Sequence, residues 1–122
     1  MIVRCLIVDD NADFLRAARA LLEQEGLRVV GVASTGAEAL RCAGELRPDV
    51  TLVDVDLGGS SGFELVRRLV DGPGIDPGHL ILISAYDEDD LADLIEVSPA
   101  IGFLGKPALS AAAIEGLIRR MH

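Results

Sequence analysis

Carboxylate side chains stand at the ends of two apolar runs of the sequence. Asp9 and Asp10 follow one run, and Asp54 follows another. If these runs are neighbouring parallel strands, the three carboxylates face one another at the edge where the strands end. Carboxylates that lie close together either take up protons, because their pKa values rise, or are neutralised by a hard divalent cation. Oxygen ligands with room for water and a phosphate favour Mg²⁺, with Mn²⁺ as an alternative.

A hydroxyl group and an ammonium group end two further apolar runs. Ser84 follows one of them, and Lys106 with Pro107 follows the other. Lys106 is the one lysine beside ten arginines, which indicates a task for a compact point charge that arginine performs poorly. With the carboxylates, these groups suit phosphoryl transfer to a carboxylate. Asp54 is then the nucleophile, a metal neutralises the phosphoryl oxygens, and Ser84 and Lys106 bind the product anion.

The apolar runs have the length and the β-branched composition of strands. They are mostly continuous rather than alternating, as strands buried on both faces are. Amphipathic segments alternate with them, and right-handed crossovers then build an open, doubly wound sheet. We predict an α/β fold of the flavodoxin-like (βα)5 type, with five parallel strands in the order 2-1-3-4-5. The predicted strands are residues 2–8, 29–33, 50–53, 80–83 and 101–104.

Each of the five predicted helices has a recognisable start. Short polar side chains cap four of them, two within Ser/Thr-x-x-Glu capping boxes. The fourth helix instead opens on a run of acids, where the helix dipole favours negative charge. We expect the fifth helix to extend to Met121. The starts are Asn11, Thr35 with Glu38, Ser61 with Glu64, the acids of residues 87–90, and Ser110.

Length and composition bound the class of protein. The 122 residues fit one domain, which we assign to residues 1–122, and half of them are hydrophobic while 3% are aromatic, so the core is aliphatic. A net charge of −9 opposes direct binding to nucleic acid. No apolar stretch approaches the roughly 20 residues that span a bilayer, and no leader precedes the first run. We expect a cytoplasmic protein with no membrane contact, in which Cys5 and Cys42 are reduced thiols.

Four motifs resemble, in order along the whole chain, those of response regulator receiver domains of two-component signalling. They are Ile-Val-Asp9-Asp10, Leu-Val-Asp54-Val-Asp-Leu-Gly-Gly-Ser-Ser-Gly62, Ile-Ser84-Ala85 and Gly105-Lys106-Pro107. The resemblance implies a phosphoprotein of the phosphorelay type. Its Asp54 accepts a phosphoryl group from a sensor histidine kinase, and the domain then controls a downstream protein or effector domain. It also implies that the chain is not an enzyme beyond its own phosphorylation and dephosphorylation.

The resemblance assigns roles to the metal ligands and to Ser84. It implies that Asp9 and Asp10 hold Mg²⁺ directly or through water, beside Asp54. The backbone carbonyl of Asp56 completes the protein ligands. The hydroxyl of Ser84 is expected to switch inward and to bond the phosphoryl oxygens.

Three further roles follow from the resemblance. Lys106 is expected to form an ion pair to the phosphoryl group. The peptide bond from Lys106 to Pro107 is expected to be cis, and Phe103 is expected to be a rotamer switch. Ser84, Phe103 and Pro107 are thus the candidate switch residues.

Several positions depart from the common pattern of the family. Gly58 stands where the family usually has proline, which loosens the loop after Asp54, and Ser84 replaces the more frequent threonine. Phe103 replaces a frequent tyrosine, so its switch would depend on burial alone, and a plain core role for it stays open. Asp56 and Tyr86 occupy variable positions that in this family tune the lifetime of the phosphoryl group.

Two other functions remain open at this point. Asp54-Val-Asp56 also resembles the DxD motif of haloacid-dehalogenase-type phosphatases, although in that family the motif follows the first strand of the core. A flavodoxin-like electron carrier would share the fold. Its first loop, however, should cradle a phosphate, and Asp9-Asp10-Asn11 would repel the phosphate of FMN.

The output and the assembly are further expectations. We favour a stand-alone receiver, with the receiver part of a longer DNA-binding transcriptional regulator as the alternative. Many receivers that carry winged-helix outputs dimerise through a charged face made by their fourth helix, fifth strand and fifth helix. Here the fourth helix is acidic and the fifth offers only Arg119 and Arg120, so complementary charge is scarce. We therefore predict a monomer, or a dimer through another face.

Overall fold

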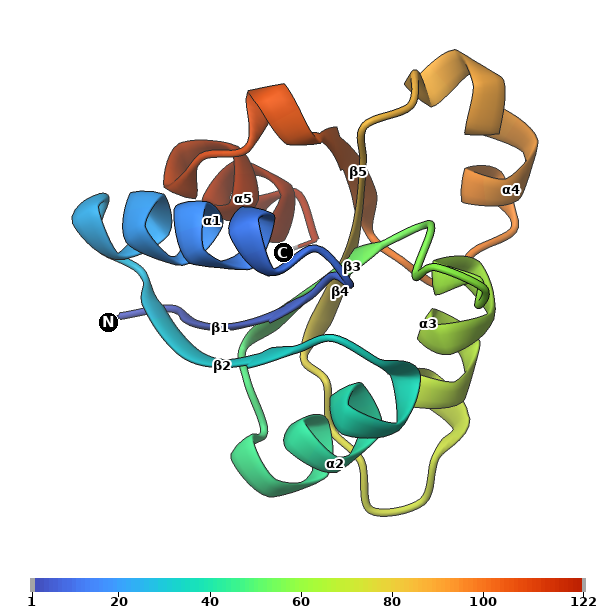
Figure 1. Cartoon of the computed structure of the whole chain (residues 1–122), viewed down its shortest axis with the longest axis horizontal. Helices are drawn as coiled ribbons and strands as arrows, with labels where there is room; N and C mark the ends of the chain where they lie inside the picture. The colour runs from blue at the N-terminus through green and yellow to red at the C-terminus, as the bar shows by residue number, and fades with distance from the viewer. Residues whose placement is uncertain (1, 122) are drawn as a thin grey trace.

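The computed structural model describes residues 2–121 and has one five-stranded parallel sheet with helices on both faces (Figure 1). The strand order is β2-β1-β3-β4-β5, which confirms the predicted doubly wound fold. The strands are β1 (Arg4–Val8), β2 (Arg28–Ala33), β3 (Val50–Asp54), β4 (His79–Ser84) and β5 (Gly102–Gly105). The α-helices are α1 (Ala12–Gln24), α2 (Gly36–Leu46), α3 (Gly62–Asp71), α4 (Ala92–Glu96) and α5 (Ala111–Arg119), and the short 3₁₀ turns are η1 (Glu88–Leu91) and η2 (Lys106–Ala108).

Two aliphatic clusters fill the two sides of the sheet. Side chains that alternate along β1 point to opposite faces, so Cys5 and Ile7 join one cluster while Leu6 and Val8 join the other. The first cluster packs against α1 and α5, and the second packs against α2 and α3. This sandwich fixes the sheet, and with it the edge at which the strands end.

The predicted side-chain caps are present at four helix starts. Asn11 Oδ1 accepts from the N–H groups of Asp13 and Phe14, and the hydroxyls of Thr35, Ser61 and Ser110 each accept from the N–H group three residues on. These bonds satisfy N–H groups that have no partner inside the helix. The last helix is shorter than predicted, because α5 ends at Arg119 and Met121 is exposed.

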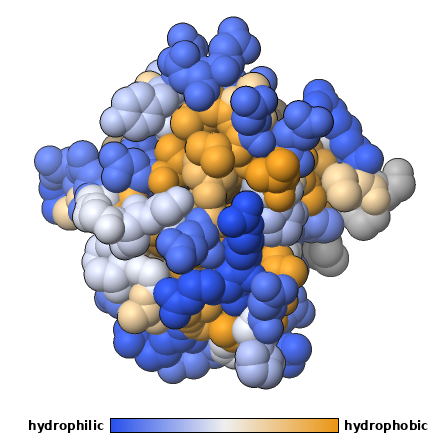
Figure 2. Space-filling view, turned by 90° about the vertical axis from the view of Figure 1, so that its right-hand side faces the viewer, coloured by the Kyte–Doolittle hydropathy of each residue, from blue (hydrophilic) through white to orange (hydrophobic). Residues whose placement is uncertain are grey.

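The fourth helix differs from its prediction. The acids expected in its first turn lie in and just before η1, which precedes a five-residue α4, and neither element has a buried residue. The reason is electrostatic, since Asp89 and Asp93 are like charges four apart and such pairs destabilise a helix. Leu94 and Val97 remain exposed at 48% and 65%. Figure 2 shows hydrophobic side chains gathered on this side of the molecule, below a cap of hydrophilic ones.

Within residues 2–121, no helix is long and apolar enough to cross a membrane.

Candidate functional site

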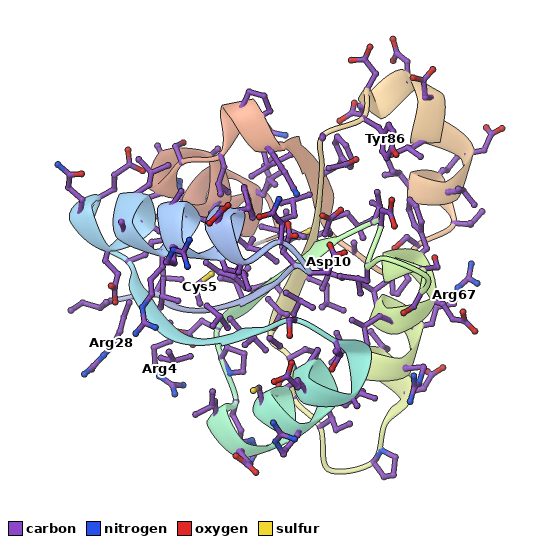
Figure 3. All side chains as sticks on the ribbon, in the orientation of Figure 1. Arg4, Cys5, Asp10, Arg28, Arg67 and Tyr86 are labelled. Carbon is purple, nitrogen blue, oxygen red and sulfur yellow. The ribbon has the colours of Figure 1, made fainter. Side chains whose placement is uncertain are left out.

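The strand ends meet at one edge of the sheet, where the chemistry-bearing residues gather. Val8 of β1 pairs with Val53 of β3, which places Asp9 beside Asp54. Ser84 pairs with Gly105, so Lys106 follows directly beyond the end of β4. In Figure 3, Asp10 lies at this edge, where α1 begins, and Tyr86 lies above it on the loop that follows β4. Sheet topology therefore brings together residues that are far apart in the sequence.

The three carboxylates form a compact group. Asp9, Asp10 and Asp54 each offer an oxygen, and these oxygens lie within 4.8 Å of one another. Asp9 is fully buried, and its Oδ1 accepts a hydrogen bond from the N–H of Asn11 at 2.8 Å. Asp54 Oδ1 accepts from the N–H of Asp56 at 3.0 Å. Local backbone groups thus orient the two buried carboxylates, while Asp10 remains exposed.

Lys106 is the cation of the site. Its Nζ lies 2.7 Å from Asp9 Oδ2 and 2.9 Å from Asp54 Oδ2, and its side chain is only 19% exposed. The same ammonium lies 4.2 Å from the centre of the Phe14 ring. Burial by itself lowers the pKa of Lys106, but the bonds and charges of Asp9 and Asp54 outweigh it, so the pKa is raised overall. The ammonium stays protonated at neutral pH.

Opposed effects act on the pKa of the Asp54 carboxyl group. Burial raises the pKa of its carboxyl group, and the neighbouring Asp9 raises it further. The N–H of Asp56 and the ammonium of Lys106 act in the opposite direction without cancelling the rise. The Asp54 carboxyl group thus lies between a cation that favours its charged form and a like charge that disfavours it.

The residues present fit a hard divalent cation. Their donors are carboxylate oxygens, as Mg²⁺ prefers. Asp9 Oδ2 is buried, and the ammonium of Lys106 lies 2.7 Å from it. A cavity of about 210 Å³ opens over the carboxylates and has room for waters or a phosphoryl group. Its lining consists of Asp9, Asp10, Asn11, Asp54, Asp56, Gly58, Ala85, Tyr86 and Lys106.

The candidate switch residues lie around this cavity rather than in it. Ser84 is buried, and its Oγ accepts from the N–H of Tyr86 at 2.9 Å. Phe103 is half-buried beside a second groove, of about 360 Å³, between α4, β5 and α5. Pro107 is exposed in η2. The expected cis bond before Pro107 is wrong: residues 2–121 contain no cis peptide bond. Pro107 instead lies in the first turn of η2, where its fixed φ suits a helical turn.

Gly58 has a steric role that the sequence did not reveal. Its φ is +63°, a conformation that proline, with φ near −65°, does not adopt. A Cβ atom at this position would lie 2.5 Å from Asp10 Oδ2. Glycine therefore leaves the space in which the Asp10 carboxylate lies. Glycine in place of the family's proline therefore suits the conformation of this loop. The pair Gly58-Gly59 was the sequence pattern that could have indicated a turn with positive φ here.

Phe14 is the site residue that sequence reasoning missed. Its spacing with Leu15 and Ala18 predicts the apolar face of a helix, which is also correct, because Phe14 packs against the first core cluster. Nothing in that periodicity distinguishes a ring that packs on the core from one that also faces an ammonium group. Only the fold places Phe14 beside Lys106.

The comparisons with known proteins agree with this geometry. Residues 5–118 match the family model of the response regulator receiver domain. The chain is 35% identical over 118 residues to the response regulator GacA of Pseudomonas viridiflava. The aligned region covers 94% of the chain and 53% of that protein. It is 36% identical to the transcriptional regulatory protein LiaR of Bacillus subtilis, over 96% of the chain and 54% of that protein. The chain thus spans about half the length of these relatives.

A solved structure extends the likeness to three dimensions. It is the signal receiver domain of a modulated diguanylate cyclase from Desulfovibrio desulfuricans, with a TM-score of 0.78 and 32% identity. The match covers 98% of the chain and 93% of that structure. Because the family model spans nearly all of the chain and the strand order is the one predicted for the doubly wound sheet, this chain belongs to the response regulator receiver domains of two-component signalling.

Proposed function

We propose that this receiver domain accepts a phosphoryl group on Asp54 from a sensor histidine kinase and passes the signal on through a change of conformation. The observation that carries the proposal is the pair of contacts that Lys106 makes with Asp9 and Asp54 at the end of β3. A structural ion pair needs only one carboxylate. Two buried carboxylates on one ammonium, with a third beside them, leave excess negative charge that a cation and a phosphoryl group can use.

The proposed reaction is an in-line displacement at phosphorus. A carboxylate oxygen of Asp54 forms the new P–O bond while the P–N bond of the phosphohistidine breaks, and the histidine nitrogen leaves with its electron pair. Asp54 reacts as the carboxylate, so no proton has to be removed from it. Lys106, already 2.9 Å from Asp54, then donates a charge-assisted hydrogen bond to the phosphoryl group.

Mg²⁺ is the proposed cofactor, with Mn²⁺ as a substitute. The side chains of Asp10 and Asp54 and the backbone carbonyl of Asp56 would hold it, with Asp9 assisting through water. When bound, it neutralises charge on the phosphoryl oxygens and orients them for attack. The group of carboxylate oxygens within 4.8 Å of one another supports this assignment.

Ser84 and Phe103 are proposed to carry the conformational response. Ser84 Oγ accepts from the N–H of Tyr86, and its O–H would turn to donate to the phosphoryl group. This turn of Ser84 would pull on the loop after β4, which leads into η1 and α4. Phe103 lines the groove between α4, β5 and α5, so a shift of α4 changes the space available to its ring.

The response goes to a partner protein or to an output domain in the same polypeptide. The two relatives are about twice as long as this chain, and one of them is named a transcriptional regulatory protein. This supports the receiver of a longer regulator over the stand-alone receiver that the sequence favoured. We propose a cytoplasmic location for the domain and no turnover of a separate substrate. The phosphatase alternative loses support, because the Asp54 motif follows β3 and not the first strand.

Phosphorylation by a small phosphodonor tests the proposal. Incubation with acetyl phosphate and Mg²⁺ should add the mass of one phosphoryl group, and Asp54→Asn should prevent the addition. Asp56→Asn is the matched control, since it makes the same change two residues on and keeps the backbone carbonyl. Full phosphorylation of the Asp54→Asn variant would show that another residue is the acceptor.

A metal titration tests the cofactor separately. Mg²⁺ should bind the parent protein measurably more tightly than Asp10→Ala, because that variant loses an exposed carboxylate ligand. Affinity should also fall as the pH drops, since protons compete for the same oxygens. Equal affinities for the two proteins would contradict the assignment of Asp10.

A further inference from the structure

Helix α1 contributes an aromatic ring to the site, and the proposed phosphoryl transfer does not use it. The ring of Phe14 lies with its centre 4.2 Å from Lys106 Nζ, on the ammonium that also contacts Asp9 and Asp54. That distance is within the range of a cation–π contact, in which the negative face of the ring attracts a cation. Among residues 2–121, the ammonium thus contacts an aromatic ring as well as two carboxylates.

The position of Phe14 is fixed from the same loop that orients the carboxylates. The N–H of Asn11 donates to Asp9 Oδ1, and the side chain of Asn11 accepts from the N–H of Phe14 at 3.1 Å. One residue thus joins the backbone of Phe14 to the buried carboxylate. Phe14 also packs against the first core cluster, which holds its side chain on the inner face of α1.

We infer that Phe14 is a positioning residue that holds the Lys106 ammonium at the acceptor site, an inference that rests on the proposed function of Asp54. The ring suits this task because it attracts the cation without carrying a charge of its own. When a phosphoryl group forms on Asp54, the ammonium must turn from the carboxylates toward the new oxygens. A carboxylate in place of the ring would compete for the ammonium, whereas the ring stays beneath it in either arrangement.

Helix α1 also holds the other end of the segment that carries Lys106. Glu25, directly after α1, accepts with its Oε1 from the N–H of Ala111 at 2.8 Å, where α5 begins. Between these points, Leu109 is buried in the same cluster as Leu15 and Leu22 of α1. Residues 106–111 are therefore tied to α1 at both ends. The ammonium can turn toward a phosphoryl group while the segment behind it stays in place.

A double-mutant cycle separates positioning from plain core packing. Phe14→Leu keeps an apolar side chain but loses the ring, and it should slow phosphorylation of Asp54 by acetyl phosphate about threefold, the size expected of a partly buried cation–π contact. Phe14→Tyr keeps the ring and should restore the rate of the parent. In a Lys106→Met background, Phe14→Leu should cause no further loss, because no ammonium remains to be positioned.

A spectroscopic measurement checks the contact without using the reaction. The ring current of Phe14 should shift the NMR signals of the Lys106 ε-methylene protons upfield in the parent and in Phe14→Tyr, and this shift should be absent in Phe14→Leu. Equal Lys106 shifts in the parent and in Phe14→Leu would overturn the inference. So would an equal loss of rate in the parent and the Lys106→Met backgrounds. If the parent takes up no phosphoryl group at all, the proposed function fails, and the ring-current shift still decides the role of Phe14.

Discussion

Removal of the ammonium at residue 106 should expose how much the acidic site depends on one cation. In Lys106→Met the stem remains, but Asp9 and Asp54 lose a charge at 2.7 and 2.9 Å. With an effective dielectric constant of about 20, each contact corresponds to about 6 kcal/mol before desolvation is counted. Desolvation offsets most of this sum, and breaking a buried pair costs about 3–5 kcal/mol. Because the cavity admits water, we expect the lower figure, a loss of about 3 kcal/mol in the free energy of unfolding.

The loss of stability caused by Lys106→Met should depend on Mg²⁺. Without the ammonium, the carboxylates should bind the dication at least tenfold more tightly, so in excess Mg²⁺ the difference between Lys106→Met and the parent should shrink by about 1.4 kcal/mol or more. Urea denaturation in EDTA and in Mg²⁺ measures both differences. Arg119→Met, which removes a cation that is 72% exposed, serves as the control and should change stability by less than about 0.5 kcal/mol. Two results would refute this prediction. One is an equal free energy of unfolding for Lys106→Met and the parent in EDTA, and the other is a difference between them that is the same in EDTA and in Mg²⁺.

Four further predictions concern the switch, the pH dependence, the loop and the assembly. Lys106→Arg keeps the charge but not the point contact, so it should still be phosphorylated, while beryllofluoride should displace the NMR signals of β5 and α4 less than in the parent; equal displacement would limit Lys106 to charge neutralisation. Because the pKa of Asp54 is raised in the folded state, its contribution to the free energy of unfolding should increase as the pH falls from that raised value to the ordinary aspartate range; a pH series of urea denaturations should show this increase in the parent and not in Asp54→Asn. Gly58→Ala should weaken Mg²⁺ binding in a titration, because its Cβ displaces the Asp10 carboxylate. Gly59→Ala also strains a positive φ but meets no atom within 4 Å, so it should weaken Mg²⁺ binding less than Gly58→Ala. Small-angle scattering should show a monomer, or a dimer that leaves the α4 and α5 faces free, and a dimer held through these two helices would contradict the charge argument.

Much of the fold and of the site could be predicted because both follow from the strand ends. Once five apolar runs alternate with helices, the handedness of the crossovers leaves few sheets to choose from, and the order places Asp9, Asp54 and Ser84 at one edge. The sequence therefore predicts which residues converge. Their roles in phosphoryl transfer and metal binding stay predictions.

The features that the sequence did not predict depend on contacts that no sequence pattern encodes. Phe14 has the periodicity of a core residue, and its second contact arises from the distance between α1 and the segment after β5. The acids of residues 87–90 satisfy the rule for a helix start, yet a 3₁₀ turn forms there, where Asp89 lies four residues before the like charge of Asp93. The bond before Pro107 is trans, although the family resemblance implied cis.

The absence of buried residues from η1 and α4 has a consequence for hydrogen exchange. Local opening costs little free energy where few apolar contacts are lost, so the amides of residues 88–96 should exchange long before those of the sheet, where β3 is buried throughout. This segment begins at Glu88, shortly after Ser84 and Tyr86. A perturbation of one or two hydrogen bonds at Ser84 is then large relative to the stability of the segment it moves. Opening of α4 should therefore leave the sheet that holds Asp54 folded.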